Sequence, residues 1–203
     1  MVDYGVVPLL LASHCRLVSG KPLLRNKRNL ACDSMRPCGH NVFNLIKCQV
    51  AHLNISAQGL FDAYLESQGT PFTKANVDSL CVSEDTFPSF VNQTSKEKEM
   101  LVALYKISVF FNASLGNITR DQKNRDSNQK DLLERLGKTS SATRGLLANL
   151  TCLLCSKYKV SNVEVTYGSD KKAEFERKRQ GCWVLKMYTK AIDHAAQALG
   201  KCH

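Results

Sequence analysis

Apolar side chains recur every three or four positions in four stretches of the chain, the spacing that gathers them on one face of a helix. We therefore predict helices over residues 40–65, 96–118, 130–158 and 173–199. The second helix starts on Thr94-Ser-Lys-Glu97, the residue pattern of a capping box. Alternation typical of a strand occurs only briefly, over residues 160–167. The pattern predicts an all-α fold.

The lengths of the connections indicate how these helices are arranged. The first and third connections, residues 66–95 and 159–172, are long, whereas the second, residues 119–129, is short. A helix of about 25 residues is about 38 Å long, and only a long connection can return along that length. Long, short, long is the loop pattern of an up-up-down-down four-helix bundle, the topology of helical growth factors and cytokines.

The first twenty residues differ from the rest of the chain. Residues 5–12 read GVVPLLLA, and the small residues before and at Gly20 suit cleavage by signal peptidase. Asp3 and Pro8 depart from the usual signal pattern, so a buried N-terminal segment is the alternative. We predict a signal peptide over residues 1–20 and one four-helix domain over residues 21–203. No other stretch approaches the roughly 20 apolar residues of a membrane span, so no membrane insertion is expected.

Cysteines and glycosylation sequons both favour an extracellular protein. Cys15 lies in the predicted signal, and the remaining cysteines are even in number, which suits disulfides: Cys32, Cys38, Cys48, Cys81, Cys152, Cys155, Cys182 and Cys202. Five sequons of the form Asn-x-Ser/Thr are candidate N-glycosylation sites: Asn54, Asn92, Asn112, Asn117 and Asn149. We expect a secreted glycoprotein stapled by disulfides.

The predicted topology restricts which cysteines can pair. The end of the third helix lies beside the start of the first, so Cys152 and Cys155 lie near Cys32 and Cys38. Two bridges between these pairs are geometrically natural. Among the four remaining cysteines, Cys81 in the first long loop and Cys182 in the fourth helix can then pair. Eight cysteines allow many connectivities, so this reasoning leaves the exact partners open.

The formal net charge of +10 narrows the choice of partners. Such an excess indicates nucleic acid, acidic glycans or a solvated surface, and nucleic acid suits a secreted chain least. Heparin-like glycans are a possible ligand of two basic clusters: Lys21, Arg25, Lys27 and Arg28, and residues 171–179.

The sequence shows no pattern typical of a catalytic site. The histidines of the mature chain fall in no recognisable nucleophile or metal motif: His40, His52, His194 and His203. We therefore expect neither an enzyme activity nor a cofactor. Cys152-Leu-Leu-Cys155 has the spacing of half a zinc site or of a redox pair. It closes a long helix with no strand before it, and its Leu-Leu continues that helix, so both alternatives are weaker than a disulfide role.

Five segments resemble the leukemia inhibitory factor family, of the interleukin-six group of long-chain four-helix cytokines: Gly5-Val-Val-Pro-Leu-Leu-Leu11, Ser114-Leu-Gly-Asn-Ile-Thr-Arg-Asp-Gln-Lys123, Arg144-Gly-Leu-Leu147, Leu154-Cys-Ser-Lys-Tyr158 and Val165-Thr-Tyr-Gly168. The segment 114–123 is the most specific, and the resemblance runs from the predicted signal to Leu199. It implies three disulfides: Cys32–Cys155, Cys38–Cys152 and Cys81–Cys182.

The resemblance also implies a ligand that brings together two receptor chains and needs no active site of its own. Contact with the leukemia inhibitory factor receptor is implied for four residues: Phe175, Lys178, Lys172 and Pro71. Contact with the signal-transducing chain shared by the interleukin-six group is implied for five: Leu45, Cys48, His52, Gly145 and Asn149. A monomeric ligand would then trigger receptor-bound kinases that control differentiation and proliferation.

Parts of this implied set depart from the family pattern or allow two interpretations. Leu45 and Cys48 stand where the family pattern has polar residues, so the contact with the shared chain differs there from the family's. Phe175 precedes Cys182 by seven residues, so its spacing favours a core position, whereas the neighbouring cations favour an interface. Another cytokine of the same group, or a basic glycan-binding secreted factor, is the alternative function.

Two further predictions concern residues outside the family pattern or in conflict with it. Cys48 and Cys202 have no family partners, yet the start of the first helix and the end of the fourth share one end of the bundle, so we predict a fourth bridge between them. Asn149 is both a sequon and an implied receptor contact. Because it lies inside a Leu-rich helix, we predict that it stays unmodified.

Overall fold

The computed structural model describes residues 25–30, 32, 38–90, 96–126, 128–160, 162–168 and 173–202. The predicted signal peptide, Lys21, Asn92 and Lys172 lie outside the described residues. So do the side chains of one basic cluster: Arg25, Lys27 and Arg28.

Four long helices make up most of the molecule: α1 (Val42–Gln68), α3 (Glu97–Arg125), α4 (Lys130–Ser156) and α5 (Glu174–Leu199). All four were predicted from the apolar spacing, and the all-α class is confirmed. The second predicted helix was too short, because α3 continues through 119–125, a polar stretch without apolar spacing. This extension reduces the second connection to residues 126–129.

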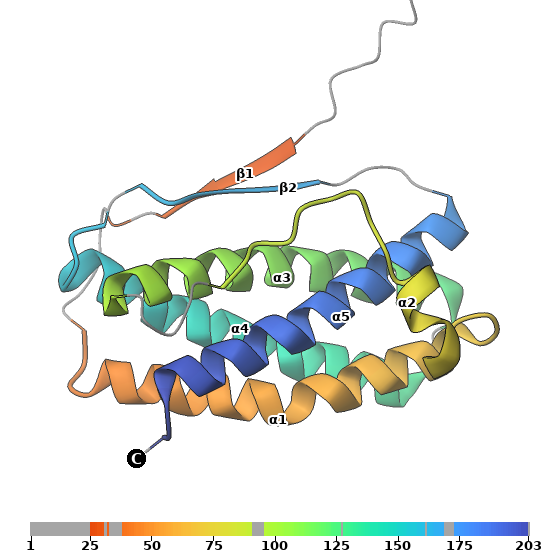
Figure 1. The fold of residues 1–203 in the computed structure, drawn as a ribbon, viewed down its shortest axis with the longest axis horizontal. Helices are drawn as coiled ribbons and strands as arrows, with labels where there is room; N and C mark the ends of the chain where they lie inside the picture. Colours follow the sequence, from red (N-terminus) through yellow and green to blue (C-terminus); the bar gives the residue numbers. More distant parts are fainter. Residues whose placement is uncertain are drawn as a thin grey trace, which may run out of the picture.

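The helices form the up-up-down-down bundle predicted from the connection lengths. Figure 1 shows α1 and α3 running in one direction and α4 and α5 running back in the other. Both α1 and α3 pack against α4 and α5, so α1 and α3 occupy opposite corners of the bundle. The start of α1 and the ends of α4 and α5 consequently share one end, and the start of α5 lies at the other.

The core fills the space between the four apolar stripes. Its largest fully buried side chains come from α1, α3 and α4, among them Leu53, Phe111 and Leu150. Phe111 stacks on Tyr188 of α5, with ring centroids 3.4 Å apart. Among the described helices, α3 is long and apolar enough for a membrane span, which was not anticipated, but 61% of that apolar window is buried inside the bundle. Its apolar residues are accounted for by the core.

Within the described residues, two short strands lie beside the bundle. Strand β2 (Glu164–Gly168) falls within the third connection, close to the strand expected over 160–167, and pairs antiparallel with β1 (Arg25–Asn29). Figure 1 shows the pair running alongside α3, and the buried Val163 and Val165 join the common core there. Strand β1 was not predicted, because its sequence RNKRN has no apolar alternation.

The first connection contains two short helical turns, η1 (Lys74–Asn76) and α2 (Val77–Leu80). Beyond them, Phe87 packs edge-on against Phe110 of α3 and Trp183 of α5. These aromatic contacts attach the long loop to the face between α3 and α5.

Four disulfides join distant parts of the chain: Cys32–Cys155, Cys38–Cys152, Cys81–Cys182 and Cys48–Cys202. The first three are the pairs that the resemblance implies, and the fourth is the additional bridge predicted from the topology. Because the sulfurs of Cys152 and Cys155 bond to cysteines outside the Cys-Leu-Leu-Cys segment, neither the zinc nor the redox-pair interpretation of that segment applies.

Candidate functional site

The residues of the first turn of α5 are exposed, and one of them is aromatic. Phe175 is 46% exposed, which rules out the core position that its spacing favoured. Its ring contacts Phe72 of the first connection, with centroids 5.6 Å apart, and Phe72 itself is buried. Pro71, which directly precedes Phe72, is half-buried. We name Pro71, Phe72, Phe175 and Lys178 the Phe175 surface.

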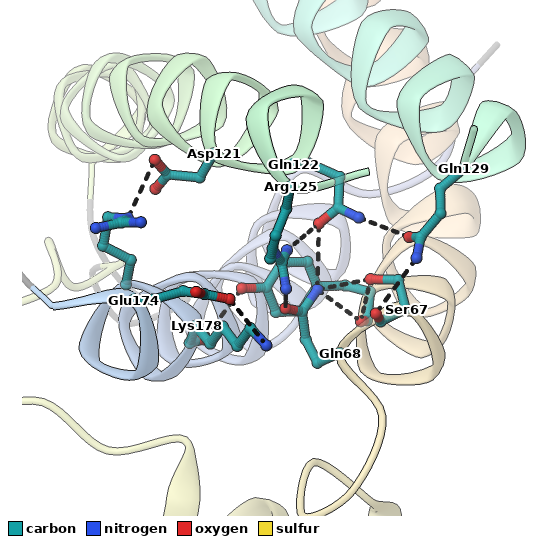
Figure 2. A network of polar contacts seen from close by, with 10 residues as sticks. Ser67, Gln68, Asp121, Gln122, Arg125, Gln129, Glu174 and Lys178 are labelled. Carbon is teal, nitrogen blue, oxygen red and sulfur yellow. Dashed lines mark hydrogen bonds and ion pairs between the residues drawn. The ribbon is translucent and has the colours of Figure 1, made fainter. Parts of the chain in front are cut away.

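Three consecutive cations follow Phe175, and each has a carboxylate partner. Lys178 Nζ lies 3.3 Å from Glu174 one turn earlier, and Arg179 pairs with Glu176 at 3.0 Å. Arg177 lies 3.3 Å from Asp121 of α3 (Figure 2). Positive charge is unfavourable at a helix N-terminus, and the acidic residues of the first turn offset it. The ion pairs hold the basic side chains at defined positions around the aromatic ring.

A hydroxyl group of α1 is hydrogen-bonded to the start of α5. The Tyr64 hydroxyl donates a hydrogen bond of 3.0 Å to the backbone carbonyl of Lys178. Burial raises the pKa of Tyr64 well above its ordinary value, so the hydroxyl keeps its proton. A Cβ atom on Gly181 would lie 2.3 Å from the Tyr64 oxygen, so the close approach of the helices requires glycine there.

A network of polar side chains closes the same end of the bundle (Figure 2). Gln68 and Gln122 are both buried, and Gln68 donates to the Gln122 side-chain oxygen at 3.3 Å. Arg125 donates to the side-chain oxygens of both glutamines. Gln122 in turn donates to Gln129 at 2.6 Å. The network connects the end of α1, the end of α3 and the residue before α4, and it explains why α3 continues through a polar sequence.

The residues implied for the shared receptor chain lie on α1 and α4. Leu45 is 48% exposed and His52 is exposed on α1, while Gly145 and Asn149 are half-buried on α4. Positions 45, 48 and 52 follow helical spacing, so they share one face of α1. Cys48 is bonded to Cys202 near the C-terminus.

Gln49 links the two halves of this set, and sequence reasoning missed it. Asn149 Nδ2 donates to Gln49 Oε1 at 2.9 Å, and a Cβ on Gly145 would lie 3.3 Å from Gln49 Nε2. A polar residue in mid-helix gives no signal by spacing alone. We name these residues the α1–α4 face: Leu45, Cys48, Gln49, His52, Gly145 and Asn149. It includes the start of α1, whereas the Phe175 surface lies at the opposite end of the bundle.

The model of the LIF / OSM family matches residues 41–199, which include all four bundle helices. The chain belongs to the LIF / OSM family. This family consists of four-helix cytokines rather than enzymes, so the family resemblance, the bundle fold and the expectation of a non-enzymatic protein are confirmed. Both surfaces described above lie within the match.

In this LIF / OSM family member, every sequon within the described residues lies in a helix. Asn54 on α1 donates to Asp193 of α5 at 3.3 Å, and the side-chain oxygen of Asn112 on α3 is buried. Asn117 is half-buried on α3. Within the described residues, no group of three His, Cys, Asp or Glu side chains is arranged to hold a metal ion.

Proposed function

We propose that the chain is a secreted cytokine of the leukemia inhibitory factor type that brings together two receptor chains. The Phe175 surface binds the leukemia inhibitory factor receptor, and the α1–α4 face binds the signal-transducing chain shared by the interleukin-six group. Residues 1–20 direct export, and residues 21–203 act as a monomeric ligand. Receptor-bound kinases then carry a signal that controls differentiation and proliferation.

The observation that carries this proposal is the separation of two unlike surfaces on one member of a cytokine family. An exposed aromatic ring among ordered cations has the composition of an interface hot spot. The α1–α4 face, in contrast, begins at the other end of the bundle. Two receptors can therefore bind one ligand without overlapping, which is the requirement for bringing them together.

The choice of leukemia inhibitory factor within the family rests on sequence segments, the ten residues 114–123 foremost. Secretion is supported by four disulfides, which persist in oxidising compartments, and by the apolar run 5–12. The glycan-binding alternative is weakened because Arg177, Lys178 and Arg179 are engaged by carboxylates. Elution from a heparin column across a salt gradient tests that alternative independently.

Surface plasmon resonance with the two receptor ectodomains tests the proposal. The purified chain should bind each ectodomain, and a complex already saturated with one receptor should still capture the other. Competition between the receptors would show that the two surfaces have been misassigned. Binding to neither receptor would overturn the proposed function.

A further inference from the structure

The Cys48–Cys202 bridge lies inside the α1–α4 face. Cys48 is one turn after Leu45 and one turn before His52, so its side chain emerges between them. That outward position is occupied by a covalent link to Cys202. The C-terminal segment is thereby held against the middle of the α1 half of the face.

The path of residues 200–202, which we name the C-terminal segment, explains how it reaches α1. Gly200 takes a left-handed φ of 74° and donates its N–H to the Ala196 carbonyl at 3.2 Å, which ends α5. Two residues later the Cα atoms of Cys202 and Cys48 are 4.8 Å apart. Figure 1 shows the chain leaving α5 and crossing toward α1 at this end. The segment is exposed along its length and fixed at both of its ends.

The charges on this side of the bundle indicate the kind of partner that fits. From Val42 to Phe61, α1 contains no Asp or Glu, and neither does the part of α4 over residues 135–156. The exposed apolar side chains Leu45 and Ile55 lie along the α1 stripe. The exposed charges of α4 over residues 135–156 and of the C-terminal segment are all positive, Arg144 and Lys201 among them. On α5 the half-buried Asp193 carboxylate accepts a hydrogen bond from Asn54 of α1. A complementary protein surface is apolar at its centre with carboxylates at its edge.

We propose that the disulfide makes the C-terminal segment part of the receptor-binding α1–α4 face, with Lys201 contacting acidic side chains of the shared signal-transducing chain. This inference rests on the function proposed above. A protein that covers both Leu45 and His52 has to contact whatever is attached to the position between them. Because the segment is tethered, it loses little conformational freedom on binding, whereas a released segment would have to be ordered or displaced.

Two variants separate the contribution of the charge from that of the tether. Lys201→Glu keeps the bridge and reverses one charge, while Cys48→Ser combined with Cys202→Ser releases the segment. Lys106→Glu is the matched control, because Lys106 is an exposed lysine on α3, at the opposite corner of the bundle from α1. Binding of each full-length mature variant to both receptor ectodomains is measured by surface plasmon resonance at two salt concentrations.

We expect Lys201→Glu to weaken binding of the shared chain about fivefold, mainly through a slower association rate and with a reduced salt dependence. Release of the segment should weaken the same binding about tenfold. Binding of the leukemia inhibitory factor receptor should be unchanged in every variant, and Lys106→Glu should behave as wild type toward both. The unchanged binding of the first receptor shows that each variant is folded.

Three results would overturn the inference. Wild-type affinity of Lys201→Glu for the shared chain would exclude a contact at that residue, and this variant stays informative even where the double cysteine variant fails to fold. Tighter binding after release would show that the segment obstructs the face. Failure of the wild-type chain to bind the shared chain at all would remove the proposed function and this inference together.

Discussion

At Gly181 the helices α1 and α5 approach so closely that a methyl group has no room, because its carbon would lie 2.3 Å from the Tyr64 oxygen. Tyr64 is itself buried and bonded to the Lys178 carbonyl, so it cannot move aside without breaking that hydrogen bond. The contact sets the position of α5 just after the residues of the Phe175 surface.

Gly181→Ala is expected to destabilise the protein by about 1–3 kcal/mol, the usual range for overpacking a core. It should also weaken binding of the leukemia inhibitory factor receptor, because the start of α5 is displaced. Tyr64→Phe removes the nearest oxygen and should partly restore both properties in the double variant. Urea denaturation and receptor binding of the two single variants and the double variant measure this coupling. Wild-type stability of Gly181→Ala would contradict the proposed contact.

Phe175→Ala combined with Lys178→Ala should reduce binding of the leukemia inhibitory factor receptor by about 2–4 kcal/mol, the loss typical of interface anchors. The melting temperature should change little, since Phe175 is 46% exposed and the ion pair of Lys178 lies within its own helix. His52→Ala is a control that should leave this receptor's binding intact. A large fall in melting temperature would indicate that the pair is structural.

Individual residues show where sequence reasoning succeeds and where it fails. The heptad spacing from Cys182 favoured a core position for Phe175, whereas the neighbouring cations and the family resemblance favoured an interface. The ring is exposed, because periodicity cannot tell where a helix extends beyond its packing partners. Gln49 was missed because its role depends on a neighbour 100 positions away, Asn149. Cys48 and Cys202 were paired correctly, since the topology alone places both at one end of the bundle.

Helices with apolar stripes could be predicted from the sequence, whereas polar elements could not. Residues 119–125 continue α3 because Gln122 and Arg125 find partners outside it at the bundle end, Gln129 before α4 and Gln68 on α1. Strand β1 exists because β2 offers it a hydrogen-bonding edge. In both cases tertiary contacts decide the local structure, and the spacing of apolar residues along the chain does not reveal those contacts.

The buried polar network at the end of α3 can test whether tertiary contacts decide the local structure there. Arg125→Ala removes donors to Gln68 and Gln122. We expect a loss of about 1–3 kcal/mol, because the buried Gln68 side chain loses the donor to its oxygen while the Gln122 oxygen keeps only its bond from Gln68. Arg120→Ala, at an exposed position on the same helix, is the matched control and should change stability by less than about 0.5 kcal/mol. Chemical denaturation of both variants provides the comparison. Equal effects would mean that the network contributes nothing specific.

Helix α4 bears on whether the Asn149 sequon is used. The Asn149 nitrogen that would carry a glycan donates to Gln49 at 2.9 Å, and the next residue, Leu150, is fully buried. We expect Asn149 to be unmodified in receptor-binding material, while Asn117 and Asn92 carry glycan. Glycopeptide mass spectrometry on protein retained by the shared chain tests this expectation. Substantial occupancy of Asn149 in that fraction would show that the α1–α4 face is misplaced.

On the scale of the whole molecule, the connection lengths predicted the topology, and the topology then restricted the disulfides. Cys32 and Cys38 are fastened to the end of α4, which fixes the chain leading into α1. Cys81–Cys182 fastens the first connection to α5 close to the Phe175 surface. The sequence could not supply the orientation of side chains on the two surfaces, because that depends on how the helices pack against one another.

The start of α3 and the end of α4 meet at an ionised cluster that makes the stability of the whole bundle depend on pH. Tyr158 donates to Glu97 at 2.5 Å, and Lys157 lies 3.1 Å from the same carboxylate oxygen. Partial burial by itself raises the pKa of Glu97, but the hydrogen bonds from Tyr158 and Lys157 outweigh it and leave the pKa below its ordinary value of 4.5.

A carboxyl whose pKa is lower in the folded than in the unfolded chain stabilises the fold above the unfolded pKa, and this contribution is lost as the pH falls through the folded pKa. We therefore expect Glu97→Gln to lower the urea midpoint at pH 7, with the gap to wild type closing as the pH falls below 4.5 and through the lowered pKa of Glu97. Tyr158→Phe removes one of the two groups responsible and should reproduce part of the effect. If the cluster acts as a unit, the double variant should lose less than the sum of the single losses. A gap between Glu97→Gln and wild type that is as large in acid as at pH 7 would show that Glu97 contributes through packing and not through its charge.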